Sequence, residues 1–413
     1  MTADRPRLLW ITEERPDRKL GGGSVRQAHL LAAVSEAMAV DLLVTGKVED
    51  PQVRSAVAGL TELNVRLAFT PDGPISRRLH WLLAALLSPR PFYAYGAGPR
   101  RRALARVIAQ RRHDYDLVCI EHETLAPLAP QDRSGQWVLT LHQIVSCELE
   151  LELRDTRRRR RRWLLRRDLQ KARRMEQDAL RDYDQLIVCS EKDATTLIER
   201  SRGTANPRIA VVPNGVDLSA FLPTPIPPEP RVLFPGSFQF PPNIHGAIWL
   251  CSEIWPRVRA AVPEATLELV GREPDKRVLA LSSEPGVRIE ADVPSMVPYF
   301  QRTRAVVVPL RVGSGTRLKA VEAMSCARPV VGTTIGLDGL DVADNVHARL
   351  ADEPEAFAQA LIEVLRDDDL ARRLGQAGRI HVEGRFGWDR IRREYVLLLS
   401  ELAHSNVPAS SAI

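Results

Sequence analysis

A loop that places two cations at the start of a helix has the composition of an anion-binding site. In residues 305–332 a short apolar strand leads into a glycine-rich loop, and a helical pattern follows from Arg317. A helix N-terminus presents unpaired backbone N–H groups at the positive end of its dipole, which makes it a ready phosphate site. Arg317 and Lys319 lie in the first turn, where the dipole disfavours cations, and a bound anion would explain them.

The same helix carries a carboxylate that can contact a sugar. Glu322 lies three residues after Lys319, on nearly the same helical face, and can accept hydrogen bonds from the hydroxyls of a ribose or sugar beside the phosphate. The loop alone is equally compatible with an ordinary strand–helix–strand unit whose charges face solvent.

The elements that must position this loop alternate between apolar strands and amphipathic helices. Strands are predicted at 8–12, 40–44, 65–69, 116–120, 138–141, 185–189, 208–212, 231–235, 266–270, 287–290 and 305–309, with a further strand starting at 329. Helices are predicted at 25–38, 247–261, 317–326, 355–366 and 388–402. The alternation predicts an α/β protein built from doubly wound parallel sheets.

The length and the proline distribution divide the chain into two domains. At 413 residues it is too long for one typical core. We predict a Rossmann-like domain over 1–222, a proline-rich linker over 223–230 and a second Rossmann-like domain over 231–385. A C-terminal helix over 386–413 follows; its return to the N-terminal domain is one option, and the periodicity leaves its domain open. Two such sheets in series predict a ligand cleft between the domains.

The composition excludes several classes of protein. No stretch approaches the roughly 20 apolar residues of a membrane span, and no signal-peptide core is apparent at the N-terminus. The five cysteines form no CxxC pair, which favours free thiols in a reducing cytoplasm. Two Asp-Tyr-Asp triplets, at 114–116 and 182–184, precede apolar strands and are interpreted as strand starts, so no metal site is predicted.

The net charge of +6 comes from one segment. Residues 154–174 contain 12 Lys and Arg and two acids, including six consecutive arginines at 157–162. This segment fits contact with an anionic membrane surface or an anionic acceptor, and it also fits a long solvated helix. Nucleic acid is not predicted as a partner, because no nucleic-acid motif accompanies the charges.

Several motifs occur in a characteristic order. The second half contains PNGVD at 213–217, GSFQFPPN at 236–243, LVG at 269–271 and GSGTRLKAVEAM followed by RPVV. The first half contains a Gly21–Gly23 loop, the triplet Glu121-His122-Glu123 and DQLIVCSEKD at 184–193. This ordered set resembles the retaining family 4 glycosyltransferases of GT-B fold, and the resemblance covers essentially the whole chain.

The resemblance implies a reaction and a set of roles. It implies an NDP-sugar donor on the C-terminal domain and a glycan, lipid-linked or small-molecule acceptor on the N-terminal domain, with no metal or cofactor. It implies a front-face substitution in which the departing phosphate takes the acceptor's proton, so no nucleophile is nominated. Arg317 and Lys319 would stabilise the leaving diphosphate. His122 would lie near the sugar and acceptor, although from its position alone it can equally satisfy a strand end. The implied donor-binding residues are Gly22, Gly23, Gly236, Ser237, Asn243, Gly271, Ser314, Gly315, Thr316, Leu318 and Glu322.

The chain departs from the family pattern at two places. The family's usual pair of glutamates, eight positions apart, is incomplete, because Ser314 stands where the first acid is expected. The usual Arg/Lys pair after the first strand of the C-terminal domain is replaced by uncharged Ser237, Gln239 and Asn243. The identity of the donor sugar therefore cannot be inherited from relatives that have both acids.

The resemblance also suggests a biological setting and leaves other activities open. The pattern is similar to a subgroup tied to exopolysaccharide or other surface-glycan synthesis, and related sequences glycosylate natural products. A cytoplasmic enzyme, peripheral to the inner face of the membrane if 154–174 binds lipid, is the expectation. A GT-B-fold isomerase or phosphorylase and a non-catalytic nucleotide-sugar binder are the alternatives.

Overall fold

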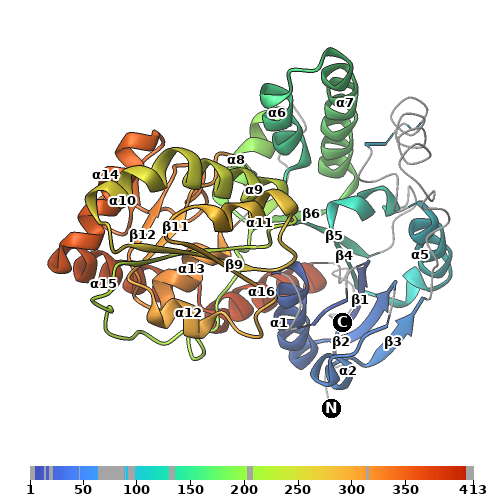
Figure 1. Ribbon diagram of the computed structural model, residues 1–413. Coiled ribbons are helices and arrows are strands. Elements are labelled where there is room, and N and C mark those ends of the chain that lie inside the picture. Colours follow the sequence, from blue (N-terminus) through green and yellow to red (C-terminus); the bar gives the residue numbers. More distant parts are fainter. Residues whose placement is uncertain are drawn as a thin grey trace. The chain divides into compact units, whose positions relative to one another are not determined.

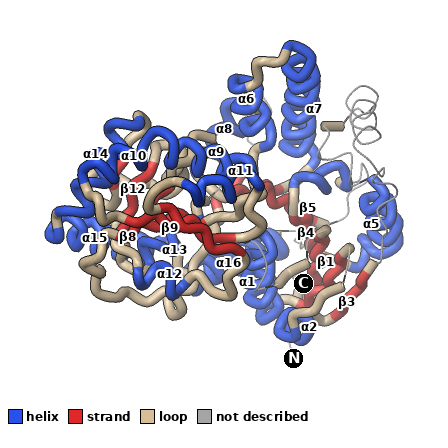
Figure 2. Tube along the Cα trace, in the orientation of Figure 1, coloured by secondary structure: helices blue, strands red, loops and turns tan. Residues whose placement is uncertain are grey.

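The chain folds into two compact units. The computed structural model describes residues 5–13, 15–17, 22–45, 47–63, 88, 90–91, 98–129, 135–201, 208–312 and 316–405. The first unit comprises Met1–Pro213 together with Ile391–Ile413, and the second comprises Asn214–Arg390. Each unit has its own hydrophobic core and its own parallel sheet with helices around it (Figures 1 and 2).

The sheet of the first unit has the order β3-β2-β1-β4-β5-β6-β7 in the described part of the chain, and every neighbouring pair is parallel. Its strands are β1 (Arg7–Thr12), β2 (Ala39–Val44), β3 (Gly59–Glu62), β4 (Leu117–Glu121), β5 (Gln136–Leu141), β6 (Gln185–Val188) and β7 (Ile209–Val211). Its helices are α1 (Gly22–Ala37), α2 (Pro51–Ala56), α5 (Gly98–Arg111), α6 (Val145–Asp155), α7 (Arg159–Asp182), α8 (Glu191–Arg200) and most of α16 (Trp388–His404), with 3₁₀ turns η1 (Arg112–Asp114) and η2 (Glu123–Leu128).

Most strands of this sheet were predicted correctly, because helices cover both of its faces and the strands are therefore apolar along their whole length. β1 is buried from Leu8 to Thr12 and β4 throughout, so each strand is a continuous apolar run that is easily recognised in the sequence. β3 was not predicted, since its GLTE sequence is polar and it lies at the edge of the sheet. The strand predicted at 65–69 lies outside the described residues.

The C-terminal helix contributes to the core of the first unit. Tyr395 of α16 is fully buried, and its ring lies edge-on to Trp10 of β1, with 6.2 Å between the ring centroids. Arg392, one turn earlier, contacts His29 of α1. The end of the chain is therefore part of the first unit's packing, which periodicity could not decide.

The sheet of the second unit has the order β10-β9-β8-β11-β12-β13, again all parallel. Its strands are β8 (Arg231–Pro235), β9 (Thr266–Gly271), β10 (Val287–Ala291), β11 (Ala305–Val308), β12 (Val330–Gly332) and β13 (Arg349–Leu350). Its helices are α9 (Pro241–Trp249), α10 (Trp255–Ala261), α11 (Lys276–Leu279), α12 (Val297–Arg302), α13 (Leu318–Ser325), α14 (Pro354–Arg366) and α15 (Asp368–Arg385), with a π turn, Leu250–Ile254, between α9 and α10.

The proline-rich segment 223–230 is not a linker between the units. The chain passes between them at Pro213/Asn214 instead, and the segment packs within the second unit. The buried guanidinium of Arg328 donates to the carbonyls of Thr224 and Pro225, at 2.6 and 3.1 Å, and Arg304 donates to that of Pro227 at 3.3 Å. Proline lacks an N–H, but its carbonyl oxygen still accepts hydrogen bonds. Arg328 lies 103 residues after Pro225, and Arg304 lies 77 residues after Pro227, so the composition of the segment does not reveal these contacts.

Two helix boundaries also differ from prediction. α1 begins at Gly22, so Gly22 and Gly23 form its first turn instead of a preceding loop. The helix predicted from 247 begins at Pro241, where proline occupies the first helical position that suits its fixed φ. In the described part of the chain, no helix has the length and hydropathy needed to cross a bilayer.

Candidate functional site

The cationic loop lies at the point in the second sheet where the strand order reverses. β8 and β11 are neighbours there, although β9 and β10 lie between them in the sequence. Ligands of open parallel sheets bind outside the carboxyl ends of the strands at such a point. Gly236 follows β8 directly and α13 follows the loop after β11, so both predicted halves of the donor site meet at this edge.

Lys319 is the centre of a compact polar group, the Lys319 cluster, which comprises Phe234, Gly236, Ser237, Asn243 and Lys319. Lys319 Nζ donates to Asn243 Oδ1 at 2.6 Å and lies 4.8 Å from the centroid of the Phe234 ring. Asn243 Nδ2 donates to the carbonyl of Ser237 at 2.8 Å, which fixes the amide's orientation. A Cβ on Gly236 would meet Asn243 and Lys319 Nζ at 3.1 Å, so glycine makes room for the ammonium group.

The electrostatics of the cluster favour an anionic ligand. Burial, together with the nearby Arg317, lowers the pKa of Lys319 to about 7, and Glu322 partly opposes this shift. Burial raises the pKa of Glu322 to about 7, and Lys319 opposes that shift in turn. Among the described residues, no carboxylate lies within ion-pairing distance of Lys319 Nζ, whose acceptor is a neutral amide. A bound diphosphate would supply the negative charge that keeps this ammonium protonated.

Arg317 is held by the loop that follows β12. Its side chain is buried, and Nε and Nη2 donate to the carbonyl of Ile335 at 3.3 and 3.2 Å. The same guanidinium lies close enough to Lys319 to lower its pKa. Its position is therefore set by a backbone carbonyl, and its charge acts on the Lys319 cluster.

The start of α13 is tied to the PNGVD segment. Thr316 Oγ1 accepts a hydrogen bond from the backbone N–H of Asn214 at 3.2 Å. The backbone N–H of Leu318, an implied donor contact, donates to the carbonyl of Thr316 at 3.0 Å. Ser314 and Gly315 lie outside the described residues.

Gly271 has a packing role. A Cβ at this position would lie 1.5 Å from the carbonyl oxygen of Gly236, so the ends of β8 and β9 touch backbone to backbone. The Gly236 N–H also donates to the carbonyl of Val270 at 3.0 Å. The sequence predicted Gly271 as a donor contact. The structure shows a packing role, in which Gly271 lets the backbone of Gly236 approach closely.

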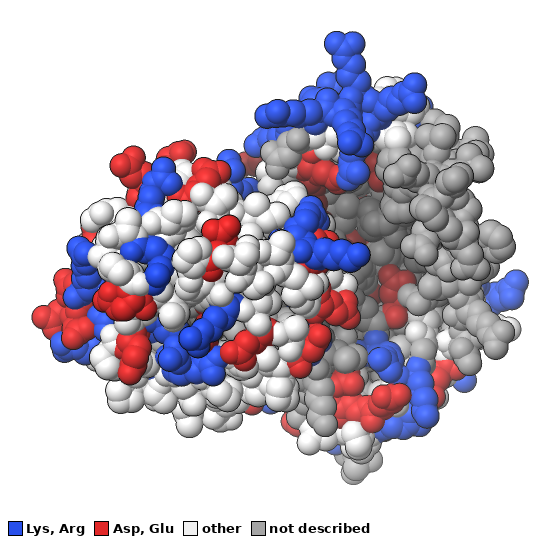
Figure 3. Space-filling view, in the orientation of Figure 1, with Lys and Arg blue, Asp and Glu red and all other residues white. Residues whose placement is uncertain are grey.

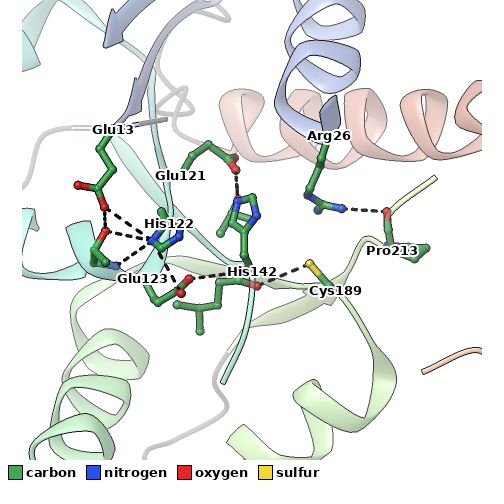
Figure 4. A network of polar contacts seen from close by, with 11 residues as sticks. Glu13, Arg26, Glu121, His122, Glu123, His142, Cys189 and Pro213 are labelled. Atoms are coloured by element: carbon green, nitrogen blue, oxygen red, sulfur yellow. Dashed lines mark hydrogen bonds and ion pairs between the residues drawn. The ribbon is translucent and has the colours of Figure 1, made fainter. Parts of the chain in front are cut away.

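A second polar group lies at the corresponding switch point of the first unit, where β1 and β4 are neighbours (Figure 4). It comprises Glu13 after β1, Glu121, His122 and Glu123 at the end of β4, and His142 after β5. His122 has φ +96°, in the left-handed region that costs a residue with a side chain about 1–3 kcal/mol. Such strain persists where the surroundings enforce it, and it concentrates at functional sites.

The side chain of His122 is held at its Nδ1 by Thr124. Its Nδ1 lies 3.0 Å from Thr124 Oγ1, and that hydroxyl donates its only proton to Glu13. The backbone N–H of Thr124 also donates to the same Nδ1, at 3.4 Å, so the side chain of His122 caps the turn that follows it.

His142 forms a second histidine–carboxylate pair against the first. Its ring stacks on that of His122, with 5.5 Å between the centroids, and its Nε2 lies 3.1 Å from Glu121 Oε2. Glu121 is fully buried and also accepts from Thr140 Oγ1 at 2.8 Å. Sequence reasoning named His122 and missed Glu13 and His142. Both follow predicted strands directly, and the meeting of strand ends at one edge was the signal that could have found them.

The first turn of α1 is anchored by a buried arginine. Gly22 and Gly23 open this turn, and Arg26 follows, with no exposed surface. Arg26 Nη1 donates to the carbonyl of Pro213 at 2.8 Å, which ties α1 to the start of the PNGVD segment. Gly21 lies outside the described residues.

The second acid of each Asp-Tyr-Asp triplet accepts a hydrogen bond from a backbone N–H near the start of a strand. Asp116 Oδ2 accepts from the N–H of Arg7 at 2.9 Å, and Asp184 Oδ2 accepts from that of Trp137 at 2.8 Å. Across the described ranges, no three His, Cys, Asp or Glu side chains are grouped so that they could hold a metal ion.

Comparison with known proteins agrees with this architecture. The family model described as Glycosyltransferase Family 4 matches residues 21–220, and that described as Glycosyl transferases group 1 matches residues 229–367. A D-inositol 3-phosphate glycosyltransferase of Xylanimonas cellulosilytica is 30% identical over 240 residues, which are 52% of this chain and 56% of that protein. The matched region thus spans about half the length of this curated relative.

Solved structures resemble the chain over nearly its whole length. Sucrose-phosphate synthase from Thermosynechococcus elongatus superimposes with a TM-score of 0.72 at 19% identity, covering 97% of this chain and 100% of that one. HepE of Anabaena, in complex with UDP and glucose, superimposes with a TM-score of 0.64 at 16% identity, covering 96% and 100%.

The two parallel-sheet units and these neighbours define a GT-B fold, which confirms the predicted fold class. The family models match most of the chain and follow one another in the order of the two units. The chain belongs to the group 1, family 4 glycosyltransferases, and the resemblance seen in its motifs is confirmed.

Proposed function

We propose that this protein is a retaining glycosyltransferase that moves a sugar from an NDP-sugar to a glycan, lipid-linked or small-molecule acceptor. The observation that carries the proposal is the Lys319 cluster, because a lysine hydrogen-bonded to a neutral amide lies beside a helix N-terminus at the strand switch point. Relatives named glycosyltransferases and a structural neighbour solved with UDP and glucose support it.

The proposed mechanism assigns each group one task. Lys319 and Arg317 neutralise the charge that develops on the diphosphate as the bond to the sugar breaks. Glu322 accepts hydrogen bonds from ribose hydroxyls. The acceptor hydroxyl attacks from the face that the diphosphate leaves, and the departing phosphate takes its proton, so the anomeric configuration is retained without a protein nucleophile. Neither a metal nor a cofactor enters this scheme.

The first unit is proposed to hold the acceptor near His122. With Nδ1 held against Thr124, the other ring nitrogen, Nε2, is proposed to form a hydrogen bond with a hydroxyl of the sugar or the acceptor. We propose that the enzyme acts in the cytoplasm, and the supporting observation is that its five cysteines are free thiols. A role in exopolysaccharide or natural-product synthesis extends the same proposal.

Product analysis tests the proposal. UDP-, GDP- and dTDP-sugars are first screened for the one that raises the melting temperature, because a ligand stabilises the state that it binds. With that donor, free NDP is expected only when an acceptor is present, and NMR of the product is expected to show the donor's anomeric configuration. A changed sugar without acceptor would establish an isomerase. Donor binding with no turnover over a broad acceptor panel would establish a binder.

The affinity for UDP, used as the probe, is expected to fall as pH rises above about 7. The Lys319 ammonium loses its proton near pH 7 in the free protein, whereas a bound diphosphate favours the charged form and raises its pKa. Binding then takes up a proton above pH 7, and the affinity falls by up to about tenfold per pH unit.

Calorimetric titration between about pH 7 and 9, in two buffers of different ionisation enthalpy, measures both the affinity and the proton uptake. Lys319→Arg is the informative variant, because arginine stays charged throughout this range and should flatten most of the decline. A wild-type affinity that does not change with pH would remove the proposed contact between Lys319 and the diphosphate.

A further inference from the structure

The exposed side of α7 carries positive charge that the fold does not neutralise. Exposed side chains that have no acidic partner among the described residues form what we call the arginine face, consisting of Arg157, Arg158, Arg159, Arg160, Trp163, Arg166 and Arg174. In Figure 3 the Lys and Arg side chains gather over this end of the α6–α7 pair. Along the helix, positions 159, 163, 166, 170 and 174 recur at spacings of three and four residues, so they share one side.

Over the first four turns of α7, no acidic residue lies on the side of the helix that carries the arginine face. The acids of α7 in this region, Asp168 and Glu176, are buried on the opposite side at 7% exposure each. α6 supplies two carboxylates at the margin: Glu152 pairs with Arg161, and Glu150 pairs with Arg173 at 2.8 Å. A helix adapted only to water usually mixes charges of both signs at these spacings. The arginine face is therefore not explained by solvation alone.

The arginines also act against the stability of their own helix. α7 begins at Arg159, with Arg158 at its N-cap, no side-chain cap and no acid in its first turn. Cations at this end oppose the helix dipole, and arginine does not cap the exposed N–H groups. Four guanidinium groups and the unpaired N–H groups of the first turn thus lie together, and each of them is complementary to an anion.

An exposed tryptophan lies among these charges and selects the kind of anionic partner. Trp163 is 49% exposed, and the Arg167 guanidinium lies 5.1 Å from its ring centroid. An indole exposed to solvent gains nothing from a soluble phosphate, but it partitions favourably into the headgroup region of a bilayer, where Trp and Arg are both enriched. A basic patch with one apolar anchor is the combination that holds a protein on an anionic membrane.

We propose that the arginine face docks this protein onto an anionic lipid bilayer, with the arginines on lipid phosphates and Trp163 inserted among the headgroups. The docking is peripheral, because no helix in the described residues has the length and hydropathy to span the membrane. It brings the first unit to a surface where lipid-linked acceptors would be found. The inference does not depend on the proposed transferase activity.

Sedimentation with lipid vesicles tests the proposal without donor or acceptor. The protein is expected to bind vesicles of phosphatidylcholine with about 30% phosphatidylglycerol at about 50 mM salt, to bind pure phosphatidylcholine vesicles far more weakly, and to dissociate at about 500 mM salt. Arg159→Glu, Arg160→Glu and Arg166→Glu together are expected to weaken binding at least about 100-fold. Two of these changes place acids in the first helical turn, where they favour the helix, so loss of fold is not expected.

Two controls make the result specific. Arg288→Glu, Arg372→Glu and Arg393→Glu together change the net charge equally at exposed sites elsewhere, and binding should stay within about twofold of wild type. Brominated lipid chains should quench tryptophan fluorescence in the wild type and much less in Trp163→Phe. Absence of binding at low salt would overturn the proposal. A second result would also overturn the proposal: RNA or heparin binds as strongly as the vesicles do, and Trp163→Phe leaves the quenching unchanged. The partner would then be a soluble polyanion.

Discussion

Lys319→Met is expected to reduce kcat/KM for the donor by about 30- to 1,000-fold, or about 2–4 kcal/mol of transition-state stabilisation. Methionine keeps the length of the side chain and its contact with Phe234, and it removes only the charge and the hydrogen bond to Asn243. The fold should be retained, because the variant no longer buries an ammonium whose pKa is lowered by desolvation.

The matched control is Lys276→Met, which makes the same change at an exposed position of α11 in the same unit. Initial rates over a range of donor concentrations, with the melting temperature of each variant, separate loss of chemistry from loss of fold. Activity of Lys319→Met within about twofold of wild type would show that the charge does not act on the leaving diphosphate. Arg317→Ala is a less direct test, because that guanidinium also holds the carbonyl of Ile335.

Gly271→Ala is expected to destabilise the second unit by about 3 kcal/mol or more, at the upper end of the cost of overpacking. Its Cβ would lie 1.5 Å from the carbonyl oxygen of Gly236. Gly271 ends β9 and Gly236 follows β8, and both strands lie inside the sheet, where the backbone has little freedom to move. For a unit of this size the melting temperature should fall by about 6–12 °C. Because Gly236 borders Lys319, the affinity for UDP should fall as well.

Gly384→Ala is the matched control. Gly384 is exposed near the end of α15, and a Cβ there would meet no atom within 4 Å. Alanine in a helix is favoured over glycine by up to about 1 kcal/mol, so this variant should be as stable as wild type or slightly more so. Scanning calorimetry compares the two substitutions. A melting temperature for Gly271→Ala equal to that of Gly384→Ala would mean that the ends of β8 and β9 separate without cost.

The sequence by itself determined most of the sheet strands and the candidate residues of a donor site. Strands buried on both faces appear as continuous apolar runs, so the ends of β1, β8 and β9 were predicted to within a residue or two. Lys319 was named from local composition, because a glycine loop before a helix has a recognisable chemistry, and Asn243 was named from the family resemblance. These features depend on neighbours within a few positions along the chain.

Only the tertiary structure decided which of these residues meet. Lys319 and Asn243 are 76 residues apart and come into contact because β11 pairs with β8, a pairing that hydrophobic patterns do not specify. For the same reason Glu13 and His142, on the ends of β1 and β5, were missed beside His122. The segment 223–230 was taken for a linker because the arginines that bind its carbonyls are distant in sequence. Local sequence thus sets strands, helices and their chemistry, whereas the order of strands in each sheet sets the contacts of the site.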